Sequence, residues 1–284
     1  MKKRSLLLII LPLTLSLFLV VNITPVKGVI FWHKDLNTKG NWIEKIDGTW
    51  FKHYGRDGYI LCGFDSQGHN DEVWQESFDR KSLPDYLKSY KVTGTGGESP
   101  LPSGTAGVYT MSASTSDPRA LVDPDILTDP DVLSKRKDTQ WFTTPFRSEN
   151  ALLTVEFNFK EDIQNKFLYA SLYFLDSDQN RKLEVTMYDG NSTNPTLSVT
   201  IEPSEAQNGL YLVFTVYNPT HLTIRLFNGY NCNPCISGIF FDSIDFPAPP
   251  FVVPEIPLGT CSALVILLSP LLLRKISRKS PRSA

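Results

Sequence analysis

The sequence has few of the residues from which metal and redox sites are usually built. It contains four cysteines and four histidines in 284 residues, and the histidines are scattered along the chain. A structural zinc site needs four ligands at regular spacing, so this class of site is excluded. The motifs of serine hydrolases, zinc proteases and phosphate-binding loops are also missing. Paired carboxylates for glycoside hydrolysis stay open, because they need proximity in the fold and no sequence motif.

A helical period is missing from the middle of the chain, and short alternating segments take its place. Residues 152–159, with the sequence LLTVEFNF, alternate apolar and polar side chains as a half-buried strand does. Clusters of Gly, Asn, Asp and Pro separate further segments of this kind, at 108–113, 167–175, 182–188, 196–201, 210–217, 222–227 and 236–241. Connections this short leave no room for crossover helices. The sequence therefore predicts an all-β fold, an antiparallel jelly-roll β-sandwich.

Two segments interrupt this succession of strands. Residues 91–107 are rich in Gly, Ser and Pro, and residues 123–137 contain two Asp-Pro pairs followed by a basic run. Long segments of this composition inside a compact domain are usually functional loops. We expect both segments to be long loops.

The charge of the chain is divided unequally between its middle and its ends. Four Lys or Arg residues precede Val29 and five follow Leu273, with no acidic residue in either place. The part between them holds 19 basic and 30 acidic residues, a net charge of −11. A nucleic-acid-binding domain carries the opposite sign, so nucleic acid is excluded as a partner.

Both ends of the chain are typical of an exported, membrane-attached protein. A basic start, an apolar run and small residues before Val29 predict a signal peptide over residues 1–28, with an uncleaved anchor as the alternative. Residues 256–273 are 18 uncharged residues, enough for a minimal transmembrane helix. A Pro-rich stalk over residues 248–255 precedes this helix, and the basic tail 274–284 is expected in the cytoplasm. The domain 29–247 would then lie outside the cell, at the cell surface.

The cysteines permit several arrangements. Cys232 and Cys235 enclose the turn Asn-Pro, and a strand-like segment follows them, which is atypical of a redox CxxC motif. We expect a structural disulfide between Cys232 and Cys235, with a bond from Cys62 to either of them as the alternative. Cys261 lies in the predicted membrane helix.

Several short stretches together resemble a known module. In chain order they are YGRDGY at residues 54–59, ASTSDPRAL at 113–121, Trp141, LYFLDSDQNR at 172–181 and SGIFFD at 237–242. This series is similar to a β-sandwich module of bacterial secreted glycosidases and surface proteins, which resembles galactose-binding-like jelly rolls. The resemblance implies carbohydrate binding, because the proteins in which the module occurs include secreted glycosidases. The long segment 123–137 and the CNPC turn depart from the pattern.

The C-terminal segment also resembles a known class. Pro254-Glu255-Ile256-Pro257, followed by an apolar run and a basic end, is similar to the sorting tails of archaeal surface proteins, which usually contain Pro-Glu-Phe-Pro. The resemblance implies a membrane protease or transpeptidase as a partner. Ile256 stands where Phe is usual, and a plain single-pass anchor is the alternative.

The polar candidates for a ligand site come from the motif positions, namely Asp117, Arg119, Asp176 and Arg181. Carboxylates and bidentate guanidinium groups can bind sugar hydroxyls. The alternative is that these residues form structural Arg–carboxylate pairs that tie loops to the sandwich.

The aromatic candidates are Trp50, Tyr54, Tyr59, Trp74 and Trp141. Such side chains either stack on sugar rings or fill the core. Trp74 and Trp141 have polar neighbours in the sequence, so we expect these two to be exposed and to bind the ligand.

No cofactor is expected, although one metal hypothesis stays open. Residues 176–187 begin like a calcium loop but lack its glycine and its closing glutamate, which excludes an EF-hand. A structural calcium bound by Asp123, Asp125 and Asp129 is the remaining option.

The sequence thus indicates a membrane-anchored cell-surface protein with a non-catalytic β-sandwich that binds a glycan or a cell-envelope polymer. A structural surface protein without glycan binding is the first alternative, and a glycosidase-like enzyme is the second.

Overall fold

The computed structural model describes residues 28–47, 49–66, 72–95, 101–102, 104–128, 136–143, 151–163, 166–176, 181–190, 192–228 and 233–243. They lie in the first of two compact units, Met1–Pro247. The second unit, Ala248–Ala284, lies outside the described residues, so the stalk, the membrane helix and the basic tail stay predictions. The signal peptide, apart from Gly28, lies outside them as well. Within the ranges given above, no helix is long and apolar enough to cross a bilayer.

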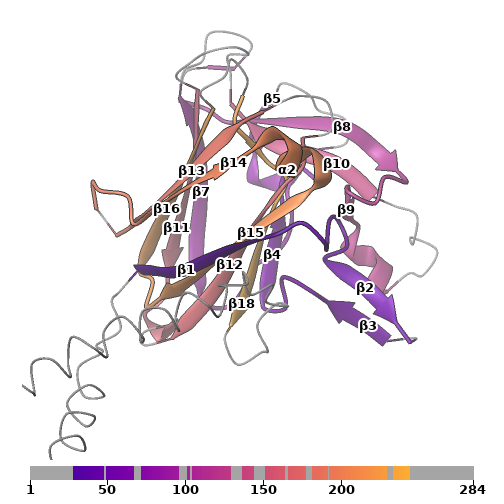
Figure 1. Cartoon of the computed structure of the whole chain (residues 1–284), viewed down its shortest axis with the longest axis horizontal. Helices are drawn as coiled ribbons and strands as arrows, with labels where there is room; N and C mark the ends of the chain where they lie inside the picture. Colours follow the sequence, from indigo (N-terminus) through magenta and orange to yellow (C-terminus); the bar gives the residue numbers. More distant parts are fainter. Residues whose placement is uncertain are drawn as a thin grey trace, which may run out of the picture. The chain divides into compact units, whose positions relative to one another are not determined.

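Two antiparallel sheets form the body of the domain (Figure 1). The six-stranded sheet has the order β1-β15-β12-β18-β4-β6, and the five-stranded sheet has the order β14-β13-β16-β11-β7. The strands of the first sheet are β1 (Gly28–Asp35), β15 (Leu210–Tyr217), β12 (Phe167–Phe174), β18 (Gly238–Ser243), β4 (Gly58–Leu61) and β6 (Arg80–Ser82). Those of the second are β14 (Leu197–Ile201), β13 (Leu183–Asp189), β16 (His221–Asn228), β11 (Leu152–Phe159) and β7 (Leu87–Thr95).

The main hydrophobic core lies between these two sheets. Strand β11 shows why, because its side chains alternate strictly between half-buried and buried along all eight residues. The buried ones, such as Val155 and Phe157, meet apolar side chains of the facing sheet, such as Leu172 and Phe241. Alternation of this kind places every second residue on one face of a strand. The apolar face of each sheet therefore meets that of the other, as in a sandwich.

A second core covers part of the other face of the six-stranded sheet. Trp42, Tyr54 and Phe64 pack there against Tyr211 and Phe240. The covering elements are the hairpin β2 (Ile43–Ile46) and β3 (Thr49–Lys52), strand β9 (Leu121–Val122) and the 3-10 helix η2 (Pro124–Leu127).

A third sheet, which we call the small sheet, also has five strands and adjoins one end of the sandwich. It has the order β17-β10-β8-β5, with β9 paired to β10. Its strands are β17 (Cys235–Ile236), β10 (Arg136–Phe142), β8 (Gly107–Thr115) and β5 (Glu72–Val73). The α-helix α2 (Pro203–Asn208) and the 3-10 helices η1 (Glu76–Phe78) and η4 (Glu161–Ile163) complete the labelled elements.

The prediction of an all-β sandwich is confirmed, and several predicted strands match the structure closely. The predicted segment 236–241 divides into β17 and β18 around Ser237. The expected loop 91–107 is wrong at its start, because β7 continues to Thr95. The expected loop 123–137 contains η2 and the first residues of β10.

The cysteine predictions have different outcomes. Cys62 is a fully buried free thiol, so the alternative disulfide through Cys62 is wrong. Cys235 is buried at the start of β17, and Cys232 lies outside the described residues. The bond between Cys232 and Cys235 therefore stays a prediction.

Candidate functional site

A cleft lies at one end of the sandwich. Its volume is about 490 Å³, and its walls come from the residues before β4, the β6–β7 connection, the start of β12 and the end of β18. The polar lining residues include Asp57, Asp85, Tyr86 and Lys166, and Phe167 contributes an aromatic ring. A concave site with a few polar groups among apolar ones is the usual form of a small-ligand site.

Asp57 is held in the wall of this cleft by hydrogen bonds on both sides of its carboxylate. The hydroxyl of Tyr86 donates to Oδ2 of Asp57 at 3.0 Å, and the hydroxyl of Ser243 lies 3.5 Å from Oδ1. The backbone N–H of Asp57 donates to the carbonyl of Phe241 at 3.2 Å. Burial, followed by the nearby Asp57 carboxylate, raises the pKa of Tyr86. Tyr86 therefore stays a neutral hydrogen-bond donor, and Asp57 keeps a fixed position beside the opening.

The motif Tyr-Gly-Arg-Asp-Gly-Tyr builds this part of the site. Gly55 adopts a φ of +71°, and its N–H and that of Arg56 donate to the carboxylate of Asp242 at 3.0 and 2.7 Å. A Cβ atom on Gly58 would lie 2.5 Å from the carbonyl oxygen of Ser82 and from Cδ of Pro84. Only glycine at this position lets the β6–β7 connection, which carries Tyr86, approach the strand this closely.

Asp242 lies behind Asp57 and is almost fully buried. Burial raises the pKa of Asp242 to about 6. The two backbone hydrogen bonds lower this pKa by less than burial raises it, and the charge of Asp57 raises it further. Of these two neighbouring carboxyl groups, Asp57 alone lines the cleft.

The structure places Asp117 and Arg119 outside the cleft, in a bidentate ion pair. Nε and Nη2 of Arg119 donate to the carboxylate of Asp117 at 2.6–3.1 Å, and Nη1 donates to the carbonyl of Gln207 at 2.7 Å. The hydrogen bond from the Arg119 guanidinium holds the pKa of Asp117 below its ordinary value. The pair therefore ties the β8–β9 connection to α2.

Asp176 and Arg181 form a second pair, which is buried. Nη1 of Arg181 contacts Oδ1 of Asp176, and the backbone N–H of Arg181 donates to Oδ2 at 2.8 Å. The N–H of Asp176 donates to the carbonyl of Ala206, the residue before Gln207 in α2. Both predicted Asp–Arg pairs thus attach loops to adjacent carbonyls of one short helix, and neither pair lines the cleft.

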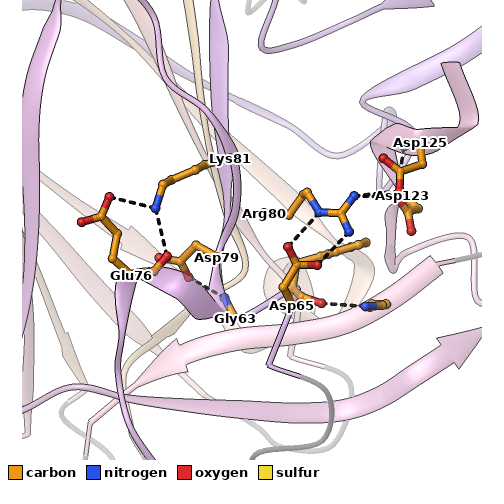
Figure 2. A network of polar contacts seen from close by, with 10 residues as sticks. Gly63, Asp65, Glu76, Asp79, Arg80, Lys81, Asp123 and Asp125 are labelled. Atoms are coloured by element: carbon orange, nitrogen blue, oxygen red, sulfur yellow. Dashed lines mark hydrogen bonds and ion pairs between the residues drawn. The ribbon is translucent and has the colours of Figure 1, made fainter. Parts of the chain in front are cut away.

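The expected exposure of Trp141 is wrong, because its side chain is 0% exposed. Its indole N–H donates to Oδ1 of Asp79 at 2.7 Å, and that of Trp74, which is half-buried, donates to Oδ2 at 3.0 Å. The Tyr90 hydroxyl and the Gly63 N–H donate to the same carboxylate at 3.0 and 2.8 Å. The partner of Trp141 lies 62 residues away in the sequence, so no local pattern could have indicated it. Figure 2 shows Asp79 beside Gly63.

The other aromatic candidates divide between the core and its margin. Tyr54 is 1% exposed and stacks on Tyr211 with ring centroids 4.1 Å apart. Trp50 and Tyr59 are partly buried against the second core. None of these three side chains lines the cleft.

The acidic residues of the calcium hypothesis lie around a guanidinium group. Arg80 donates to both carboxylate oxygens of Asp65 at 2.8 and 2.9 Å and pairs with Asp125 at 2.8 Å (Figure 2). Asp123 lies 3.7 Å from the same guanidinium group and also accepts the N–H of Asp125 at the start of η2. Asp129 lies outside the described residues. Among the described side chains, no group of three or more His, Cys, Asp or Glu residues could hold a metal ion.

The residues around the cleft gave little signal in the sequence. Asp57 belongs to the YGRDGY motif but was not among the predicted ligand residues. Tyr86, Lys166 and Phe167 belong to no motif, and the fold alone brings them to Asp57. A search for tyrosine and acidic residues near Gly-rich turns could have found Asp57.

Comparisons with known proteins do not assign the chain to a family. No family model matches the sequence, and no curated protein is similar to it. A structure titled as a Xyl-CBM35, a carbohydrate-binding module, in complex with a glucuronic-acid-containing disaccharide has 8% identity and a TM-score of 0.26, covering 36% of this chain and 72% of that one. A CBM35 structure from Paenibacillus barcinonensis has 11% identity and a TM-score of 0.26, with coverages of 36% and 77%.

An exo-beta-1,3-galactanase from Phanerochaete chrysosporium, solved with beta-1,3-galactotriose, is also similar, at 10% identity and a TM-score of 0.31. The alignment covers 69% of this chain but only 31% of the galactanase. These likenesses are too distant to transfer a ligand or an activity to this chain.

Proposed function

We propose that the domain is a non-catalytic carbohydrate-binding module of jelly-roll type, displayed at the cell surface by the C-terminal segment. The observation that carries this proposal is the cleft, in which the fixed carboxylate of Asp57 lies among Asp85, Tyr86, Lys166 and Phe167. The predicted signal peptide and membrane helix support export and attachment.

The chemistry of the cleft suits a sugar. Carboxylate oxygens of Asp57 and Asp85 accept hydrogen bonds from hydroxyl groups, and the ammonium group of Lys166 donates to them. The ring of Phe167 offers an apolar face to the C–H face of a pyranose. Because Tyr86 and Ser243 restrain Asp57, little side-chain freedom is lost when the ligand binds.

The direct test is binding of the purified full-length chain, in detergent, to a panel of glycans. We expect Asp57→Asn and Phe167→Ala each to weaken the binding about tenfold or more, since tenfold corresponds to the loss of one good contact. Glu184→Gln, on the exposed face of the five-stranded sheet, is the control and should bind as the wild type does. A folded wild type that binds no glycan would overturn the proposal.

A structural surface role is the second candidate, and the two Asp–Arg pairs favour it. Both pairs, which are the polar residues of the module motif, tie loops to α2 rather than lining a cleft. If this role is the correct one, Asp57→Asn should change neither cell-surface attachment nor the result of the glycan panel. Arg119→Ala should instead lower the free energy of unfolding of the domain. Release of reducing sugar from any bound glycan would instead indicate a glycosidase, since Asp57 and Asp85 both face the cleft.

A further inference from the structure

Half-exposed aromatic side chains continue from the cleft over the outer face of the six-stranded sheet. Phe167 lines the cleft and begins β12, and Tyr169 lies two residues further along the same strand. Residues at positions i and i+2 of a strand share one face of the sheet. Leu168, between them, points into the main core, so Phe167 and Tyr169 lie on the opposite, outer face.

The strand pairing adds two aromatic side chains to this face. Tyr217 of β15 lies opposite Phe167, and the two ring centroids are 4.7 Å apart. Phe31 of β1 and Tyr169 of β12 both pair with Thr215 of the intervening strand. We call Phe31, Thr215, Tyr217, Phe167 and Tyr169 the aromatic strip.

The strip is accessible and amphipathic. Phe31 is 40% exposed, and the other four side chains are half-buried, with Tyr169 packed against the second core. Its rings are flat apolar surfaces, while the hydroxyl groups of Tyr169, Tyr217 and Thr215 lie among them. Such a surface matches a chain of sugar rings, which presents C–H faces and hydroxyl edges in alternation. Two neighbouring strands are ~4.8 Å apart, so the strip extends ~10 Å from β12 to β1.

The charge of the domain narrows the ligand class. The net charge of residues 29–273 is −11, and the cleft itself contains two carboxylates and one lysine. A polyanionic glycan would be repelled, so a neutral one fits. Tyr169, Thr215 and Phe31 lie in one row across three neighbouring strands, so an extended chain, as β-1,4-linked pyranoses form, fits the strip better than a coiled one.

We propose that the cleft and the aromatic strip form one continuous site, which binds a neutral, extended β-1,4-linked polysaccharide along its length. This inference rests on the proposed glycan-binding function of the cleft and adds the substrate class. It requires that affinity increase with chain length, because Phe31 lies outside the cleft and only a chain that extends beyond the cleft reaches it.

The experiment measures the affinity of the full-length chain for β-1,4-linked glucan, xylan, mannan and chitin oligosaccharides of two and six units. For the wild type we expect the hexasaccharide of at least one series to bind about tenfold more tightly than its disaccharide. Phe31→Ala should abolish this difference and leave disaccharide binding unchanged, because Phe31 does not line the cleft. Asp57→Asn should weaken binding at both lengths.

Tyr188→Ala is the matched control, because Tyr188 is a half-buried tyrosine on the five-stranded sheet, where the Arg225 guanidinium covers its ring at 4.6 Å. Thermal unfolding confirms that each variant is folded. Equal affinity for both lengths, or a loss in Phe31→Ala no larger than in Tyr188→Ala, overturns the extended site but leaves the cleft proposal standing. Binding of none of the four series overturns the extended site, and binding of no glycan in the wider panel overturns the cleft as well.

Discussion

Arg181 and Asp176 form an ion pair whose side chains are only 4% and 1% exposed. The pair closes the β12–β13 connection, because the backbone N–H of Arg181 donates to the same carboxylate at 2.8 Å. Burial of two charged groups costs solvation free energy, and their mutual attraction offsets this cost only when both partners are present.

Removal of one partner should therefore be costly. We expect Arg181→Met to lower the free energy of unfolding by about 3–5 kcal/mol, because the carboxylate of Asp176 is left buried without its counter-charge. Urea unfolding measures the change. The double variant Asp176→Leu with Arg181→Met should lose less than the single one. A single-variant loss under about 1 kcal/mol would contradict the structural role of the pair.

Trp141→Phe separates a structural role of this residue from ligand binding. The substitution keeps a large ring but removes the hydrogen bond to Asp79, so we expect a loss of about 1–3 kcal/mol in unfolding free energy. Glycan affinity should stay at the wild-type value, because the indole has no exposed face. Weaker glycan binding by a folded Trp141→Phe would restore Trp141 as a ligand residue.

The buried carboxyl groups predict how stability depends on pH. Burial raises the pKa of Asp79 to about 6, from an ordinary value of 3.8. The folded state thus binds the proton more tightly than the unfolded state, and this contribution to stability is present at low pH and lost as the pH rises from about 4 to about 6. This rise of the pKa corresponds to about 3 kcal/mol of folding stability, and the raised pKa of Asp242 makes stability depend on pH in the same direction.

The measurement is the free energy of unfolding of wild type and Asp79→Asn between pH 4 and pH 7. The difference between the two curves should change by about 3 kcal/mol over that interval, with the variant less dependent on pH. Other groups cancel in the difference; in Asp35, for example, burial raises the pKa, but several hydrogen bonds together lower it by more. A difference curve that is flat, or that slopes the other way, would show that the four donors outweigh the burial of Asp79.

Gly58→Ala tests how the cleft wall is built. The new Cβ would lie 2.5 Å from the Ser82 carbonyl oxygen, so the β6–β7 connection must move, at a cost of about 1–3 kcal/mol. Because Tyr86 lies on that connection, glycan affinity should also fall. Gly190→Ala is the control, since it has a φ of +61° but open space around it. Its cost should stay near 1 kcal/mol, with glycan affinity unchanged.

The strands that the sequence predicted well are those whose alternation is complete. Strand β11 matches its predicted bounds, since every second side chain enters the main core. Strand β15 also matches, although its first five side chains are all buried, because its apolar run is bounded by turn residues. The short strands before residue 83 had no such pattern. Strands β4, β5 and β6 have four, two and three residues, too few for a period to appear. Tertiary contacts, such as the approach of Ser82 to Gly58, decide where they form.

The candidate site was predicted less well than the fold, for a physical reason. The motif residues Asp117, Arg119, Asp176 and Arg181 are close in sequence and pair locally, so they were easy to notice. The cleft residues come from four separate segments, and only the packing of the sheets brings them together. Trp141 was placed wrongly because its polar sequence neighbours gave no sign of the buried partner Asp79.

The attachment of two loops to one short helix has a consequence for the motions of the domain. The β8–β9 connection is held by the Gln207 carbonyl, and the β12–β13 connection by that of Ala206. Opening of α2 removes the anchor of both loops at once, so the two should open together as one cooperative unit. In native-state hydrogen exchange, amides of both connections would then share a single opening free energy, although about 60 residues separate them in the chain.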